Sequence, residues 1–172
     1  MMSPLFRFHL SIPFLFLVFL VSCTVRYSPV AAEIPAQAQT FSVGSFPVRA
    51  PLAGPNVSIS FVETLKTLML QQTRLDLEKK DGDLKFEGAI TGYAVQPIAI
   101  QGNETSALNR LTVTVTVRYT NSFDREKDFE LSFSRFADYS STRNLADVEE
   151  VLMIEINDQL AQDIFDRSLG NW

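Results

Sequence analysis

The sequence predicts an α+β fold: a two-layer α/β sandwich in which a mixed four- to five-stranded sheet has two helices on one face. Residues 111–120 alternate strictly between apolar and polar side chains, which is the period of a strand buried on one side. Residues 57–72 and 145–169 repeat apolar side chains at every third or fourth position, which is the period of amphipathic helices. One half-buried sheet and two apolar helix stripes fit together most simply as two layers.

The elements are expected in the order β-α-β-β-β-β-α. The first strand alternates on both sides of Gly44, which indicates a bulge. In the helix that follows, Ser60 and Glu63 fit a capping box. The second strand is short and leads into Lys80-Asp81-Gly82-Asp83, a string typical of a hairpin turn. The elements are expected at residues 40–48, 57–72, 74–78, 84–100, 111–120, 129–134 and 145–169.

The second half of the chain supplies the longer elements. In the third strand, Gly92 is expected to shift the register, so that Tyr93 takes over the inner face from Ile90. A charged turn at residues 124–128 separates the fourth strand from the fifth. The last helix, capped by Asn144 or Ser141, carries a continuous apolar stripe, made of Val148, Leu152, Ile156, Leu160 and Ile164.

Short connections predict that the second to fifth strands form an antiparallel meander. The first strand, the helix and the second strand form a crossover. Both helices cover the apolar face of the sheet, so the opposite face is expected to be wet. Two interpretations of that face remain open, an ordinary solvated sheet and a surface docked against a polar partner. Its hydroxyl side chains are those of Thr112, Thr114, Thr116, Ser132 and Ser134.

The first 22 residues have the features of a secretory signal peptide that ends before a lipidated cysteine. Arg7 precedes an apolar run from Leu10 to Val21, too short for a bilayer span of about 20 residues. The string Leu20-Val21-Ser22-Cys23 resembles the bacterial lipobox, in which the cysteine receives a diacylglyceryl group. We therefore expect cleavage before Cys23 and a lipid anchor on its sulfur. A plain signal peptide with an incidental cysteine is the alternative.

Residues 23–39 are expected to form an extended tether, because they contain Pro29 and Pro35 and few large apolar side chains. Residues 40–172 are then one domain. Loss of Arg7 with the signal leaves 14 of the 15 basic residues against 20 acidic ones, a mature net charge of −6. An acidic chain without a basic block is not expected to bind nucleic acid.

Composition also limits the chemistry. The only histidine, His9, leaves with the signal, and the only cysteine is acylated. The mature chain therefore lacks the groups for Ser-His-Asp or Cys-His catalysis, for zinc sites built on His or Cys, and for disulfides. We expect no cofactor and no metal. Carboxylate catalysis remains as an alternative, but Asp147, Glu149 and Glu150 fit the solvated side of a helix better.

Several strings resemble the LptE-like lipopolysaccharide-assembly lipoproteins, in the form carried by Bacteroidetes-type bacteria. The resemblance covers nearly the whole domain, and its motifs occur in the same order. The strings are residues 40–55, 72–75, 86–93 (Phe-Glu-Gly-Ala-Ile-Thr-Gly-Tyr), 101–105, 109–113, 134–139 and the terminal Asn171-Trp172.

The resemblance implies a non-enzymatic lipoprotein, anchored at the periplasmic leaflet of the outer membrane. It implies a position inside the lumen of a large outer-membrane β-barrel translocon, which the lipoprotein helps to assemble. It also implies that the protein assists delivery of lipopolysaccharide to the outer leaflet. The family pattern supplies no catalytic residues.

Lipopolysaccharide carries phosphates, so the resemblance implies contacts with basic side chains. The candidates for lipopolysaccharide or barrel contact flank the fourth and fifth strands, although solubilising side chains are a simpler interpretation of each. They are Arg110, Arg118, Arg125, Lys127 and Arg135. Two other functions remain open: a stand-alone periplasmic lipid-binding lipoprotein, which needs an enclosed apolar pocket, and a carboxylate-based cell-envelope enzyme.

Overall fold

The computed structural model describes residues 34–98 and 107–170. The predicted signal peptide, Cys23 and most of the predicted tether lie outside these residues, as do Gln101–Thr105 and Asn171-Trp172. None of the helices in the described ranges is long and apolar enough to cross a membrane. Residues 34–39, assigned above to the tether, include a turn in which the Ala38 amide donates to the Pro35 carbonyl at 2.9 Å, and Ala38 is buried.

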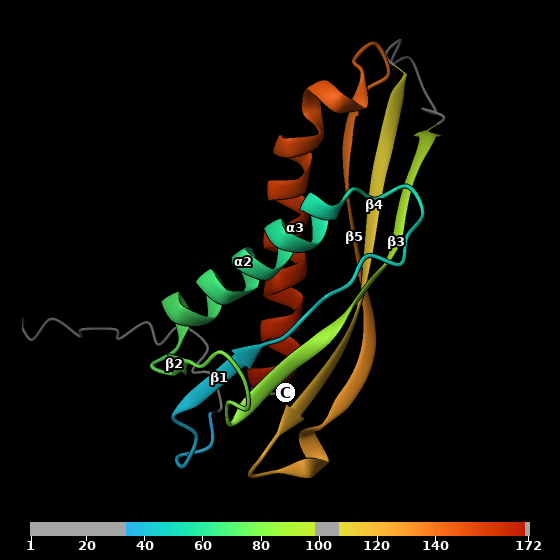
Figure 1. Ribbon diagram of the computed structural model, residues 1–172. Helices are drawn as coiled ribbons and strands as arrows, with labels where there is room; N and C mark the ends of the chain where they lie inside the picture. Colours follow the sequence, from blue (N-terminus) through green and yellow to red (C-terminus); the bar gives the residue numbers. More distant parts are fainter. Residues whose placement is uncertain (1–33, 99–106, 171–172) are drawn as a thin grey trace, which may run out of the picture.

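The predicted α+β sandwich is confirmed. Two helices pack on a five-stranded mixed sheet. Helix α3 runs beside the long strands, and α2 crosses α3 (Figure 1). The elements are β1 (Thr40–Val43), α2 (Pro55–Gln72), β2 (Asp76–Leu77), β3 (Leu84–Ile98), β4 (Leu108–Asn121), the 3₁₀ turn η2 (Arg125–Lys127), β5 (Phe129–Ser140) and α3 (Leu145–Leu169).

The order of strands in the sheet is β2-β1-β3-β4-β5. β1 is parallel to both of its neighbours, whereas β3, β4 and β5 form an antiparallel meander. The predicted pairing of the second strand with the third is therefore wrong, because β1 lies between them. The residues predicted as a hairpin turn instead carry the chain back past β1. Gly82 makes this possible, because a Cβ at that position would lie 2.5 Å from the Phe41 carbonyl carbon.

Asp83 holds the start of β1 at this crossing. Its Oδ2 accepts hydrogen bonds from the Gln39 amide at 2.9 Å and from the Thr40 amide at 3.0 Å. The Asp83 amide donates to the Thr40 hydroxyl at 3.0 Å. The hydrogen bond from the Gln39 amide, together with those from Thr40, holds the pKa of Asp83 below its usual value. The short turn thus fixes β1 between β2 and β3.

The predicted register shift in the third strand is confirmed. β3 pairs with β4 from Leu84↔Asn121 to Ile98↔Leu108, with an irregularity between Ile90 and Gly92. Tyr93 is buried beyond it, as predicted, and donates a hydrogen bond of 2.6 Å to Glu149 of α3. Burial is the main cause of the raised pKa of Tyr93, and the Glu149 carboxylate adds to it.

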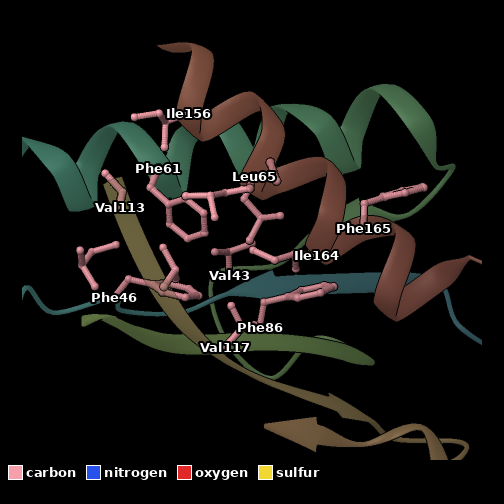
Figure 2. Packing of buried hydrophobic residues seen from close by; sticks show 14 of the residues in the cluster. Val43, Phe46, Phe61, Leu65, Phe86, Val113, Val117, Ile156, Ile164 and Phe165 are labelled. Atoms are coloured by element: carbon pink, nitrogen blue, oxygen red, sulfur yellow. The ribbon is translucent and has the colours of Figure 1, made fainter. Parts of the chain in front are cut away.

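The core lies between the sheet and the helices (Figure 2). From α2, Phe61 packs edge-on against Phe46 with ring centroids 5.1 Å apart. The predicted stripe of α3 is buried. The predicted capping box is wrong, since α2 begins at Pro55 and Ser60 lies inside it. The Ser60 hydroxyl instead accepts a hydrogen bond of 2.8 Å from Asn157 where the two helices cross.

The first and fifth strands differ most in length from prediction. β1 ends at Val43, before Gly44, and Val48 returns only as an isolated bridge to Ile90. β5 continues beyond Ser134 to Ser140. The extension was not predicted, because Arg135 occupies a position on the helix-covered face, where an apolar residue was expected. Its charge is accommodated there by a carboxylate of α3.

Candidate functional site: the open face of the sheet

One face of the sheet has no helix over it in the described residues. We call it the open face. It follows from the strand period: in β4, the odd-numbered residues from Leu111 to Val117 are buried against the helices, so the even-numbered ones point the other way. The open face consists of Glu87, Ala89 and Thr91 from β3, Arg110, Thr112, Thr114, Thr116 and Arg118 from β4, and Glu130, Ser132, Ser134, Phe136 and Asp138 from β5.

Hydroxyl groups form cross-strand pairs along the middle of the open face. The Thr116 hydroxyl lies 3.2 Å from the Thr91 hydroxyl and 2.9 Å from the Ser132 hydroxyl, so one chain of hydroxyls spans β3, β4 and β5. One step along the strands, the Thr114 and Ser134 hydroxyls are 3.1 Å apart. Each hydroxyl can donate and accept, so this surface can adapt to either kind of polar group on a partner.

An ion pair flanks the hydroxyls at each end. Arg118 donates two hydrogen bonds to Glu130 Oε2, at 3.0 and 2.7 Å. Arg110 makes a two-pronged contact with Asp138, at 2.8 and 2.9 Å. The Arg110 guanidinium also lies 3.5 Å from the centre of the Phe136 ring. Hydrogen bonds from Arg110 lower the pKa of Asp138, and the Glu130 carboxylate raises the pKa of Arg118. The face is thus polar, and each of its two arginines has a carboxylate partner.

The five basic candidates do not come together. Arg110 and Arg118 lie on the open face. Arg135 lies on the helix-covered face, opposite Val113, and binds Asp163 of α3 with two contacts of 2.6 Å. Arg125 and Lys127 belong to η2, in the loop between β4 and β5. The hydroxyl candidates, in contrast, form one continuous surface.

A hollow of about 420 Å³ opens on the open face beside the segment that follows β1. Arg49 and Pro47 form one wall, and Thr116, Arg118 and Glu87 are among the residues of the floor. Its lining mixes both charges with hydroxyls. Two further hollows, of about 550 and 570 Å³, lie between α2 and α3 and open to the surface. These surface hollows are unlike the enclosed apolar pocket that a carrier of acyl chains needs.

The acidic residues of the described chain give no sign of a catalytic pair. Glu149, a candidate for carboxylate chemistry, accepts the hydrogen bond from Tyr93. Where the pKa of a carboxyl group in the described chain is displaced, at Asp81, Asp83 and Asp138, the direction is downward. A general acid needs the opposite displacement.

The geometry defines a class of protein: a small α+β domain with two helices on one face of its sheet and an open polar face on the other. The family follows from the sequence comparison. Residues 38–168 match the family model described as LptE, lipopolysaccharide-assembly, and the chain belongs to that family. A role in lipopolysaccharide assembly, as an envelope lipoprotein, follows from this membership. None of the curated proteins compared matches the sequence.

Solved structures share the fold at low sequence identity. A protein of Xanthomonas campestris is similar with a TM-score of 0.54 and 7% identity, covering 83% of this chain and 88% of that one. A hypothetical protein of Chlamydia trachomatis has a TM-score of 0.52 and 10% identity, covering 76% and 98%. Rare lipoprotein B of Shewanella oneidensis has a TM-score of 0.46 and 11% identity, covering 73% and 91%. At such identities the first two similarities show the fold alone.

Sequence reasoning missed the acidic half of this surface. Glu130 and Asp138 were not among the candidates, although each neutralises an arginine that was. The signal was present: charges of opposite sign stand at even-numbered positions of consecutive antiparallel strands. However, pairing them requires the register across the loop between β4 and β5, and the chain pattern alone does not give that register. Thr91 was missed because it lies at the irregularity of β3.

Proposed function

We propose that this protein is an outer-membrane lipoprotein that plugs a β-barrel lipopolysaccharide translocon, helps assemble it, and assists lipopolysaccharide delivery to the outer leaflet. Membership of the LptE family supports the pathway. The observation that carries the plug is the open face, with its continuous hydroxyls between two ion pairs.

The physical argument concerns desolvation. Docking a surface against a partner costs free energy for each charge that loses water without gaining a counter-charge. On the open face, Arg118 and Arg110 already have carboxylate partners, so neither arginine needs a new counter-charge when the face contacts a polar wall, and Glu87 is the charge that a donor of that wall would meet. The interior of an outer-membrane barrel is such a wall. The face fits a polar lumen better than it fits lipid.

The proposed lipid anchor is compatible with this position. If Cys23 carries the acyl chains, the residues between it and Ile34 span at most about 40 Å when fully extended. That reach lets the domain enter a barrel while the anchor stays in the periplasmic leaflet. A diacyl group, with a further chain on the new amino terminus, provides the two signals that stable anchoring needs.

We rank the candidate lipopolysaccharide contacts by whether each basic side chain already binds a carboxylate. Arg110, Arg118 and Arg135 would each have to leave a carboxylate before binding a phosphate. Arg125 is exposed on η2, two residues after Phe123, whose ring is 47% exposed. A cation beside an exposed apolar ring matches an amphipathic phospholipid-like ligand. We therefore place Arg125 first among the five basic candidates.

Photocrosslinking in cells tests the plug. A benzophenone amino acid at Thr114, in the middle of the open face, is expected to give a covalent adduct with a large outer-membrane β-barrel. Peptide mapping is expected to place the adduct on lumen-facing residues. The same probe at Ile59, on the solvent side of α2, is the matched control. Equal adducts at both positions, or no barrel adduct from Thr114, would contradict the proposal.

A further inference from the structure

The strands at the two edges of the sheet differ in length. One edge is β2, which has only two residues and therefore offers few unpaired backbone groups. The other is β5, with twelve residues, which pairs with β4 and with no other strand of the described chain. The β4–β5 register continues without a shift from Leu108↔Ser140 to Tyr119↔Phe129. β5 is therefore a long and regular edge.

The hydrogen-bond pattern shows which backbone groups of β5 are unpaired. The Ser141 amide donates to the Ala107 carbonyl at 3.0 Å, which marks that opposed pair as hydrogen-bonded. Bonded and non-bonded pairs alternate along antiparallel strands. The odd-numbered residues of β5 thus bond to β4, and the even-numbered ones direct N–H and C=O away from the sheet. No acceptor or donor in the described residues binds these groups at Glu130, Ser132, Ser134, Phe136 and Asp138.

Natural edges are usually protected by proline, bulges, or charged side chains that repel another strand. β5 contains no proline and no glycine. Its three charged side chains are all engaged within the chain: Glu130 with Arg118, Asp138 with Arg110, and Arg135 with Asp163. Exposed apolar side chains stand on both sides of the strand, with Leu131 40% exposed and Phe136 45% exposed. The edge therefore has neither a proline nor a bulge, and its charged side chains are held in ion pairs within the chain.

We propose that the free edge of β5 is a binding site for an extended segment of another polypeptide, which adds to the sheet as a sixth strand. Main-chain hydrogen bonds to the even-numbered residues supply the affinity, as in other cases of strand addition. This interface uses the outward backbone groups of β5, whereas the open face presents side chains, and it does not depend on the plug.

The two sides of β5 set the chemistry of the partner segment. On the helix side, Leu131 and Phe133 extend the core to the edge, so alternate residues of the partner are apolar there. On the open side, Ser132 and Ser134 lie between the two ion pairs and favour hydroxyl residues on the partner. The strands of a closed barrel have no free edge. The segment is therefore a loop, a terminus or another strand outside a closed barrel.

A second copy of this chain fits less well. Antiparallel pairing of the whole strand about a two-fold axis at Ser134 places Glu130 of one copy opposite Asp138 of the other. Like charges directly opposite each other destabilise strand pairing. A self-dimer is accordingly the outcome that counts against the proposal.

The test uses the full-length lipoprotein in its native membrane, with the benzophenone amino acid at Leu131, which is 40% exposed on the helix side of β5 and not part of the open face. Ser134→Pro removes an outward amide without removing a bond to β4, and Ser134→Ala keeps that amide as the matched control. We expect an adduct with an extended segment of a different polypeptide. Its yield is expected to fall about fivefold or more in Ser134→Pro and to stay near wild type in Ser134→Ala.

Residue-resolved hydrogen exchange on the wild-type protein provides a second measurement, which does not require the proline variant to fold. The amides of Ser132, Ser134 and Phe136 are expected to be protected in the isolated membrane assembly relative to the lipoprotein alone in detergent. The amides of Leu131 and Phe133, already bonded to β4, should change little. Unprotected outward amides, an adduct unaffected by Ser134→Pro in a folded variant, or an adduct with a second copy would overturn the proposal. Adducts from Thr114 report on the plug independently.

Discussion

The two faces of β4 are made by one strand and have opposite properties. Leu111, Val113, Val115 and Val117 are completely buried against the helices, whereas Thr112, Thr114 and Thr116 remain partly accessible on the open face. Every second residue thus contributes to the core, and the residues between them contribute to a surface. The difference teaches that stability and binding are separable here, residue by residue, along a single strand.

The largest expected effect is on the helix-covered face. Phe61→Ala removes a fully buried ring that packs on Phe46, and should lower the free energy of unfolding by about 3–5 kcal/mol. Urea titration followed by circular dichroism measures it. Ile59→Ala, on the same helix but 62% exposed, is the control and should change stability little. Similar losses in the two variants would mean that the core is not where we place it.

A matched pair on β4 tests the comparison itself. Val115→Thr places a hydroxyl in the core without a partner, and should cost about 1–3 kcal/mol. Thr114→Val loses one surface hydroxyl contact, with Ser134, and should stay within about 0.5 kcal/mol of wild type. The same urea titrations apply. Equal costs would show that the two faces are not distinct.

Asp83 provides a pH-dependent test of the connection between β2 and β3, which holds β1 in the sheet. Its pKa is lowered in the folded state, so its stabilisation is present above the unfolded pKa of about 3.9 and is lost as pH falls through the folded pKa. At pH 6, Asp83→Asn should cost about 1–2 kcal/mol after solvent screening. The gap between variant and wild type should shrink towards pH 3. A gap that is constant with pH would contradict the assignment.

The smallest effects are expected at the arginine–carboxylate pairs. Arg118→Gln on the open face should leave the thermal midpoint unchanged, because both partners are more than half exposed. Arg135→Gln should lower the thermal midpoint by about 1–3 °C, because its partner Asp163 is only 27% exposed. Differential scanning calorimetry at low and high salt measures the thermal midpoints of the two variants. A larger loss for Arg118 would assign the open face a structural role.

Where a sequence pattern depended on one strand or one helix, it predicted the structure well. The alternation of β4, the stripe of α3 and the register shift at Gly92 all follow from the local periods of strands and helices. The hydroxyl surface followed as well, because the same alternation that buries valines must expose threonines. The fold class came from combining these elements.

Features that depend on which elements meet were not predictable in this way. Residues 80–83 are typical of a turn, and the same residues suit a hairpin or a connection that crosses β1. The strand order β2-β1-β3 was therefore not predicted. Arg135 interrupted the apolar pattern of β5. Its partner, Asp163, lies on α3, 28 residues further along the chain, so the sequence near Arg135 does not indicate this ion pair. The pairing of the two open-face arginines with carboxylates was missed for the same reason, since it depends on cross-strand register.

The central claim is that the open face, and not the stability of the domain, carries the function. The most direct test measures surface lipopolysaccharide and the thermal midpoint on one variant, Thr114→Trp, produced as the only copy in cells. The account predicts a thermal midpoint within a few degrees of wild type, with surface lipopolysaccharide reduced to the level of cells without the protein, while Thr114→Ser behaves as wild type. Normal surface lipopolysaccharide with a folded Thr114→Trp domain would contradict it.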